Sequence, residues 1–364
     1  MDKYKVIIIL ISIFQLSNCQ EMKNKKIVPS YVVQLSRANG NSIIGTVQDS
    51  IITLEGEPAY FPFIHSSGNW GSSGKGSSYE SGTPIGVDAV YYAKTENAFY
   101  HLKVEFPRDK VIDWVQRAYA IDEPKSSEVK LTTRYINRKD EPDFDRKYND
   151  MITAYQNMTD LIFGFAPKGY VVVWLGYGPT QIELGAYQAE LVTDEKKIKE
   201  YEKMYQRKYN ISASHFDELA VRNYLPDQSS EKWKRYRSRH LWYPKMISNH
   251  KGFRAFRMDI DYYNGERETI LRPWIEQVPM EARAIPREIS FFWETGKGEA
   301  YEGRAFFDWE KTHEFFKNSG KQFCLEFRID PDNNGFQLLI NNQILKADSL
   351  RIYSSDLKFQ DSYK

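Results

Sequence analysis

The sequence has few cysteines, no excess of either charge, and no later hydrophobic run long enough to cross a bilayer. Two cysteines, Cys19 and Cys324, cannot build a disulfide framework or a cysteine-rich zinc site. Fifty basic residues against 49 acidic ones leave no electrostatic footprint for nucleic acid, so we expect no nucleic-acid partner. Hydrophobic residues make up 41% of the 364 positions, which excludes disorder for most of the chain.

Motifs for catalysis and for cofactors are also missing. The glycine-rich stretch 68–76 has the wrong spacing for a phosphate-binding loop, and no G-x-S-x-G elbow occurs. His313 and Glu314 begin the pattern H-E-x-x-H, but Lys317 replaces its second histidine. We therefore expect no cofactor and no metal. A glycosidase-type carboxylate pair is defined by its separation in space, so an enzyme stays open as an alternative.

The segment from Asp330 to Gly335 is the sharpest local pattern. Its Asp, Asn and Gly residues match the start of a calcium loop, but Asn341 stands where that loop needs a bidentate glutamate. The flanking residues have the pattern of strands rather than helices. We expect a tight β-turn with Gly335 at positive φ rather than a calcium site.

Residues 1–18 are expected to be an export signal. Asp2, Lys3 and Lys5 precede an apolar run from Val6 to Phe14 that is too short to span a bilayer. The residues that follow, Leu16-Ser17-Asn18-Cys19, resemble the bacterial lipobox, whose cysteine is acylated and becomes the first residue of the mature protein. Gln20 after that cysteine argues against retention in the inner membrane. We expect lipidation at Cys19, a tether over residues 19–30 and a location in the envelope, at the outer membrane. The alternative is ordinary cleavage after Cys19.

Hairpin signals dominate the rest of the chain. Asn39-Gly40 is expected to join strands at 31–35 and 42–54, and Asn264-Gly265 to join strands at 253–263 and 268–274. Residues 66–82, rich in glycine and serine, predict a mobile surface loop. Residues 87–106 predict two strands followed by a helix, and strands close the chain at 323–329, 336–340 and 344–353.

The strand–strand–helix pattern recurs 201 residues later. That offset places Tyr92 on Trp293 and Tyr100 on Tyr301, and a looser third copy begins at Gly169. Its helix carries an apolar stripe of Ile198, Tyr201, Tyr205 and Tyr209. We expect an α+β fold with largely antiparallel sheets built from repeated β-hairpin plus helix units. The alternative is that aromatic residues align by chance in a chain this rich in them.

Two charged stretches that contain proline, 122–148 and 217–239, are the best candidates for linkers or insertions. We place the domain boundary in the second. The expected organisation is a first hairpin–helix domain at 31–215, a charged linker or insertion at 216–242, and a second hairpin–helix domain at 243–364.

Three segments resemble one known family. These are YYAKTENAFYHLKVEF, which ends at Phe106, FGFAPKGYVVVWLGYGP at 163–179, and IPREISFFWETGKGEAYEGRAFF at 285–307. They are similar to bacterial lipoproteins grouped as family 2931 of the domains of unknown function, over roughly residues 50–320. The resemblance implies a secreted or lipid-anchored protein and names no catalytic group.

Aromatic residues beside turns and strands are the remaining candidates for function, because large rings with nearby arginine suit protein interfaces or sugar stacking. Core packing is the alternative for most of them. The candidate binding residues are Trp70, Tyr92, Trp174, Trp242, Tyr243 and Trp293. We expect a non-catalytic envelope lipoprotein that binds another protein, such as an immunity-type or envelope partner. The alternative is an envelope hydrolase whose site is assembled from dispersed carboxylates and histidines.

Overall fold

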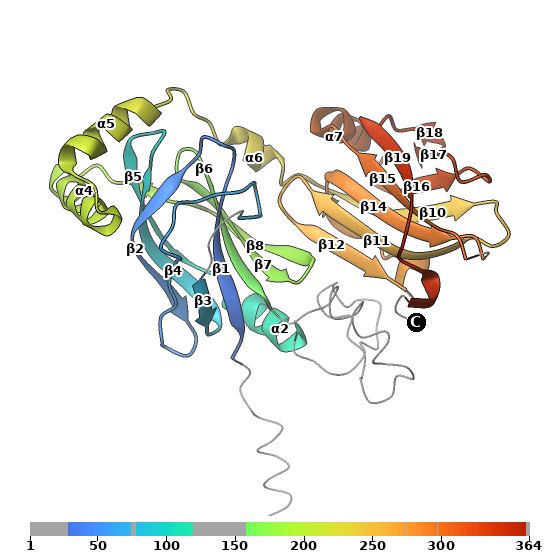
Figure 1. Ribbon diagram of the computed structural model, residues 1–364, viewed down its shortest axis with the longest axis horizontal. Helices are drawn as coiled ribbons and strands as arrows, with labels where there is room; N and C mark the ends of the chain where they lie inside the picture. Colours follow the sequence, from blue (N-terminus) through green and yellow to red (C-terminus); the bar gives the residue numbers. More distant parts are fainter. Residues whose placement is uncertain (1–27, 74–77, 119–157, 273, 297, 362–364) are drawn as a thin grey trace, which may run out of the picture.

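A computed structural model describes residues 28–73, 78–118, 158–272, 274–296 and 298–361, and shows two β-sandwich halves side by side (Figure 1). The first half contains β1 (Ser30–Arg37), β2 (Ile44–Thr53), β3 (Ser78–Ser81), β4 (Pro84–Ala93), β5 (Ala98–Glu105), α2 (Arg108–Ala118), β6 (Asp160–Ala166), β7 (Tyr170–Tyr177), β8 (Thr180–Gln188), β9 (Glu190–Leu191), α4 (Glu195–Tyr209), α5 (Ala213–Asn223) and α6 (Glu231–Arg235).

The second half contains β10 (Arg239–Ser248), β11 (Arg254–Tyr262), β12 (Arg267–Leu271), η2 (Trp274–Glu276), β13 (Glu281–Ala284), β14 (Pro286–Glu294), β15 (Ala300–Phe306), α7 (Trp309–Asn318), β16 (Gln322–Ile329), β17 (Phe336–Ile340), β18 (Gln343–Ile344), β19 (Ser349–Ser354) and η3 (Phe359–Asp361). None of the described helices is both long and apolar enough to cross a membrane.

Three sheets build the two sandwiches. One ten-stranded sheet runs through both halves in the order β19-β15-β14-β11-β12-β8-β7-β6-β1-β3. The sheet β2-β4-β5-β9 packs on it in the first half, and β13-β10-β16-β17-β18 packs on it in the second. Among the described strands, only β1 with β6 and β10 with β16 pair in parallel. The fold is therefore α+β with largely antiparallel sheets, as expected.

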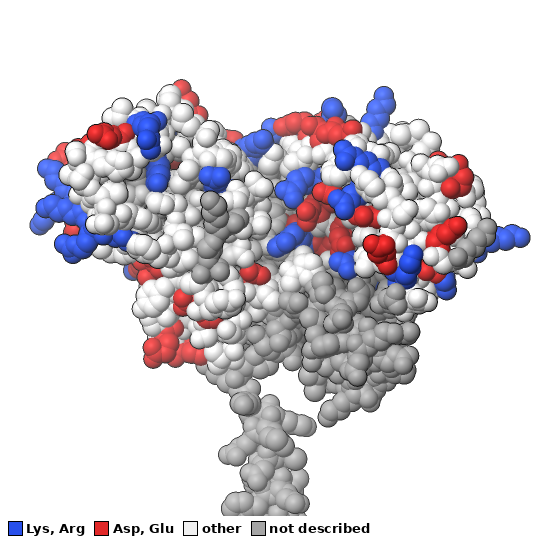
Figure 2. Space-filling model, viewed as in Figure 1, with Lys and Arg blue, Asp and Glu red and all other residues white. Residues whose placement is uncertain are grey.

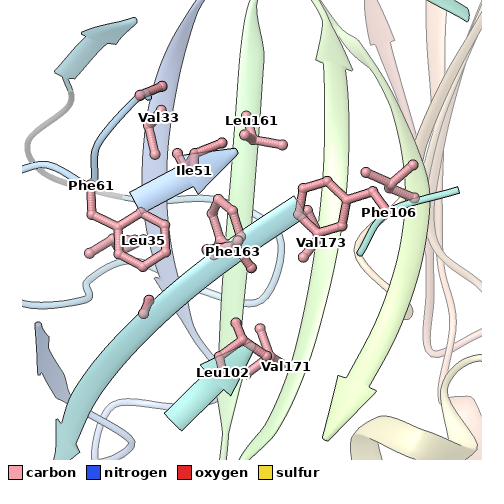
Figure 3. Close-up of a cluster of buried hydrophobic side chains, with 14 of the residues drawn as sticks. Val33, Leu35, Ile51, Phe61, Leu102, Phe106, Leu161, Phe163, Val171 and Val173 are labelled. Atoms are coloured by element: carbon pink, nitrogen blue, oxygen red, sulfur yellow. The ribbon is translucent and has the colours of Figure 1, made fainter. Parts of the chain in front are cut away.

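Each half has its own apolar core, because inward-facing residues alternate along strands of both sheets. In the first half, Leu35 and Phe163 from the large sheet meet Leu102 of β5 and the ring of Phe61, from the loop after β2 (Figure 3). The centroids of the Phe61 and Phe163 rings lie 4.7 Å apart. A second, separate cluster of buried residues runs from Trp242 to Leu345.

The two halves pair their strands in the same way. In each, a hairpin (β4–β5 or β14–β15) leads into a helix and then into a strand parallel to the first strand of that half. Tyr91 pairs with Tyr100 and Trp293 with Tyr301, and all four belong to or pack on the cores. The position matching Trp293 is therefore Tyr91 rather than Tyr92. The 201-residue offset is wrong by one for the first strand, and a slip of one residue changes the face of the sheet.

The third hairpin–helix copy has a different place in the fold. The strands β7 and β8 form a hairpin, as expected, but β7 continues the sheet beside β6, as β17 does beside β16. Its following helix, α4, does pack with the expected stripe. Tyr205 is buried there, with Ile198, Tyr201 and Tyr209 around it.

Of the two hairpins expected at Asn-Gly pairs, one is confirmed and the other is wrong. The hairpin at Asn264-Gly265 joins β11 to β12. At Asn39-Gly40, by contrast, β1 and β2 lie in different sheets, so this connection crosses the sandwich instead of closing a hairpin. The Asn39 carboxamide accepts from the amides of Asn41 and Ser42, which explains the local turn. Turn chemistry signals a change of direction, not which sheet the next strand joins.

The segment 330–335 is a turn between the antiparallel strands β16 and β17, as expected. The Asp330 amide donates to the Gly335 carbonyl at 2.9 Å. Positive φ belongs to Asn333 (58°) and not to Gly335, which corrects that detail. The carboxamide oxygen of Asn333 accepts from the buried Trp293 indole at 2.9 Å, and this contact fixes its place in the turn.

The N-terminal segment and the two charged stretches were also expected to have defined roles. The export signal, Cys19 and most of the tether lie outside the described residues, as does the stretch 122–148. The expected linker 216–242 holds most of α5, all of α6 and the start of β10.

Candidate functional site

The aromatic residues expected at the surface are mostly core. Trp174, Trp242 and Trp293 have no exposed area, and Tyr92 and Trp70 are 2% and 9% exposed. These five rings are not available to a partner, which corrects the expectation. Tyr243 alone among the six candidates is partly exposed, and its hydroxyl contacts Cys324. Alternation along β4 does separate the two neighbours Tyr91 and Tyr92, but α4 and α5 cover the outer face and bury Tyr92 there.

Trp70 anchors the loop that the sequence predicted to be mobile. Its ring meets Trp174 edge-on at 5.1 Å and lies 6.2 Å from Trp233. The amide of Ser67 donates to the carbonyl of Leu35, and the amide of Asn69 donates to the carbonyl of Ser72. The described part of this loop is thus fixed against the large sheet.

An open pocket of about 580 Å³ lies where this loop meets β1, the β4–β5 turn and the end of α4. We call it the aromatic–basic pocket. Its lining residues are Arg37, Ile43, Phe63, Ile64, His65, Ser66, Ser67, Gly68, Lys94 and Tyr209. No carboxylate is among these lining residues.

Three nearly parallel rings form one wall of the pocket. Tyr209 stacks on His65 with centroids 4.5 Å apart, and on Phe63 at 5.6 Å. Phe63 is 64% exposed, which is unusual for a phenylalanine. Lys208 lies 5.8 Å from the centre of the Phe63 ring and also bonds to Asp49. The wall therefore offers a flat apolar surface with positive charge beside it.

Two cations in the pocket lack an acidic partner within the described ranges. Arg37 donates only to the carbonyls of Gly68 and Gly40. Lys94 forms no ion pair with any described residue, and burial, with Arg222 nearby, lowers the pKa of its ammonium. A partly buried cation without a counter-charge is costly, so an incoming anion would be favoured here.

His65 is held in its neutral form. Burial, with Lys94 as a lesser cause, lowers the pKa of His65 to about 4. Its Nε2 lies 3.0 Å from the hydroxyl of Tyr205 in α4. A neutral imidazole at ordinary pH leaves the positive charge of the pocket on Arg37 and Lys94.

Sequence reasoning missed this pocket because its residues come from four separate segments. Phe63 and His65 lie in the short motif Phe61-Pro62-Phe63-Ile64-His65, whose proline and aromatic residues are the one local signal. Tyr209 is a member of the predicted apolar stripe of α4, but its role as a pocket wall depends on the docking of that helix.

A second cleft, of about 620 Å³, lies where the two halves meet, and we call it the junction cleft. Figure 2 shows acidic and basic side chains gathered in this region. Glu268 and Arg283 form a buried pair with two contacts, at 2.9 and 3.0 Å. Glu266 pairs with Arg239 at 2.7 Å, and Glu183 with Arg237 at 2.7 Å.

These ion pairs bear on the hydrolase alternative. A general acid needs a carboxyl group whose pKa is raised by burial or by another carboxylate. Glu183, Glu266 and Glu268 each face an arginine rather than a second carboxylate. The part of the chain that the structure describes also holds no group of three or more residues able to ligate a metal.

Comparison with known proteins gives one match. Residues 44–224 match the family model described as protein of unknown function, DUF2931. This supports the resemblance over the first half and does not extend to the similar segment at 285–307. No curated protein and no solved structure matches the chain. The matched range contains Phe63, His65, Lys94 and Tyr209, so most of the aromatic–basic pocket belongs to the part shared with that family.

Proposed function

We propose that this chain is an exported, lipid-anchored envelope protein that binds a partner protein without catalysis, through the aromatic–basic pocket. One observation carries the proposal: Arg37 and Lys94 both line an open pocket, and none of the residues that line it is acidic. The aromatic stack beside them adds the flat apolar surface that is enriched at protein interfaces. The partner would present an acidic side chain or a terminal carboxylate next to an apolar residue.

Capture from the native envelope tests this proposal. The anchored protein and two variants, Lys94→Gln and Phe63→Ala, are crosslinked in cells and purified, and the attached proteins are identified by mass spectrometry. We expect one partner to be reduced about tenfold by either variant, which corresponds to about 1.4 kcal/mol. Lys103→Gln is the matched control, because Lys103 is exposed and paired with Asp88 outside the pocket.

The outcome separates the two candidate functions. A partner captured equally by the wild type and both variants would contradict binding at this pocket. A released fragment of glycan or peptide, formed by the wild type and lost in Glu183→Gln or Glu268→Gln, would favour the hydrolase instead. Melting temperatures of all variants show whether a loss reflects unfolding.

The anchor is tested by labelling. Cells fed a radiolabelled or clickable fatty acid should label the wild type, and Cys19→Ser should remove the label because the thiol is the acylated group. Export should persist in that variant, since the apolar run Val6–Phe14 is unchanged. An unlabelled wild type would contradict the anchor and favour cleavage after Cys19 to a soluble form.

We also propose that the two halves arose by duplication of one hairpin–helix sandwich. The shared strand pairing supports this, with Tyr91 and Trp293 in matching positions. Strand order recurs among unrelated sandwiches, so the test is whether relatives exist that contain a single half.

A further inference from the structure

Among the described residues, a single backbone pair continues the ten-stranded sheet from one half into the other. Gln181 of β8 pairs with Arg267 of β12. Beyond that pair, β8 continues to Gln188, and within the described ranges only β7 pairs with this stretch. The Glu183 amide donates to the Glu266 carboxylate at 3.0 Å, and from Leu184 to Gln188 the other edge of β8 has no strand beside it among the described residues. Such an edge can accept another strand.

The junction cleft runs along this open edge. Residues 181–185 of β8 form one side of the cleft, and residues 281–283 of β13 line it as well. Ile182, which is half-buried, contributes apolar surface to the cleft, and the buried side chains of Trp114 and Leu184 lie at its wall. The cleft thus combines an extended backbone with apolar surface along the same line.

Two buried polar atoms at the cleft have no hydrogen-bond partner among the described residues. Of the two Glu183 oxygens, Arg237 contacts Oε1, at 2.8 Å through Nε and 2.7 Å through a terminal nitrogen, and Oε2 is left unpaired. Arg267 donates to Gln181 at 2.6 Å through a terminal nitrogen, and its Nε is left unpaired. Glu183 is 8% exposed, so its Oε2 has little access to bulk water.

These two atoms are one acceptor and one donor. A peptide unit carries the complementary pair, an N–H that donates and a C=O that accepts. The charges around the cleft are nearly balanced, which disfavours a small ion as the ligand and favours a neutral backbone. The charged lining residues are Lys110, Arg237, Arg239, Arg267, Arg283, Glu183, Glu266, Glu268 and Glu281.

We propose that the junction cleft binds an extended segment of a partner protein, which adds as a strand to the open edge of β8. The backbone of the segment bonds to β8, and its peptide units reach Oε2 of Glu183 and Nε of Arg267. This site shares no lining residue with the aromatic–basic pocket. It is therefore a second contact surface, and its test does not depend on the first.

Site-specific photo-crosslinking identifies the partner segment that is then used in the test. A photoreactive phenylalanine analogue is placed at Ile182 in β8, at Phe63 in the aromatic–basic pocket, and at the exposed Lys321 as a control. The segment crosslinked from position 182 in the native envelope is mapped by mass spectrometry and synthesised as a peptide. We expect this peptide to bind the purified protein and to slow amide hydrogen exchange in residues 184–188.

The peptide itself then distinguishes strand addition from other binding. N-methylation of those amides that face β8 should weaken binding about tenfold each, because each change removes one hydrogen bond and adds a clash. Methylation of the alternate amides should have little effect. Arg267→Lys keeps the charge but removes Nε, and should weaken binding severalfold, with its melting temperature as the check on folding.

Three results would overturn the proposal. The first is binding that is unchanged by N-methylation at every position. The second is crosslinking from position 182 only to this chain itself. The third is no crosslink from position 182 when position 63 gives one, which would leave the proposed function standing and reject the second site.

Discussion

His65 and Lys94 are polar side chains that the fold holds partly out of water, and burial lowers the pKa of each. Both face a pocket without a carboxylate among its lining residues, so neither gains a compensating charge there. At the scale of single residues, this is the feature that most clearly distinguishes the pocket from ordinary surface, where charges are paired or solvated.

The low pKa of His65 makes stability depend on pH. Its pKa is about 4 in the folded chain against 6.5 for an unperturbed histidine, so between these values the unfolded chain binds more protons. Stability therefore falls as the pH drops from about 6.5 to 4 and levels off below that range. Urea unfolding at pH 7 and at pH 5 measures how much the free energy of unfolding falls in each protein. We expect this fall to be about 1 kcal/mol smaller in His65→Gln than in the wild type, a value reduced for the partial exposure of His65. Equal losses would show that His65 is not the cause.

Asn333 combines positive φ with a buried hydrogen bond. Asn333→Ala should lower the free energy of unfolding by about 2–3 kcal/mol, because it leaves the Trp293 indole unpaired and puts a methyl side chain in a left-handed conformation. Asn333→Asp keeps an oxygen that can accept from the Trp293 indole, so it should lower the free energy of unfolding by less. Gly335→Ala should cost under about 1 kcal/mol, since its added carbon meets only the rotatable Asp330 carboxylate. Urea unfolding that ranks Gly335→Ala above Asn333→Ala would contradict this assignment.

At the scale of elements, the contact between β8 and β12 depends on two glycines. Gln181 of β8 donates to the carbonyls of Gly71 and Gly265, at 2.8 and 2.6 Å. Gly265 has a φ of 89°, and an added Cβ would lie 2.8 Å from the Trp174 ring. The loop at Gly71, the strand β8 and the β11–β12 turn approach one another this closely because no side chain separates them.

Gly265→Ala should therefore loosen the junction. We expect a loss of about 2 kcal/mol or more, part from positive φ and part from the clash with Trp174. Gly56→Ala is the matched control, because Gly56 has a φ of 95° and open space around it, so it measures the backbone contribution alone. Chemical unfolding gives both values, and limited proteolysis reports whether the junction opens. Equal losses in the two variants would contradict a packing role for Gly265.

At the scale of the whole molecule, two separate cores share one long sheet and meet at a narrow contact. The cores end on either side of the junction. Two hydrogen bonds cross it, from the Glu183 amide to the Glu266 carboxylate at 3.0 Å and from the Arg267 guanidinium to the Gln181 carboxamide at 2.6 Å. Ligand sites occur preferentially between such units, because the surfaces there are concave and carry polar groups from both sides. The aromatic–basic pocket belongs to the first half, whereas the junction cleft exists only when both halves are present.

The sequence alone determined the strand-rich class, the hairpins at 87–106 and at Asn264-Gly265, and the apolar stripe of α4. These features rest on alternation, turn residues and helical periodicity, all of which act over a few neighbouring positions. Only the tertiary structure decided that β1 and β2 enter different sheets and that Tyr92 and Trp174 are core. Burial of an aromatic ring depends on what covers it, and for Tyr92 that cover is a helix more than 100 positions away. Neither candidate site could be found from the sequence for the same reason: each brings together residues from distant segments that no local pattern connects.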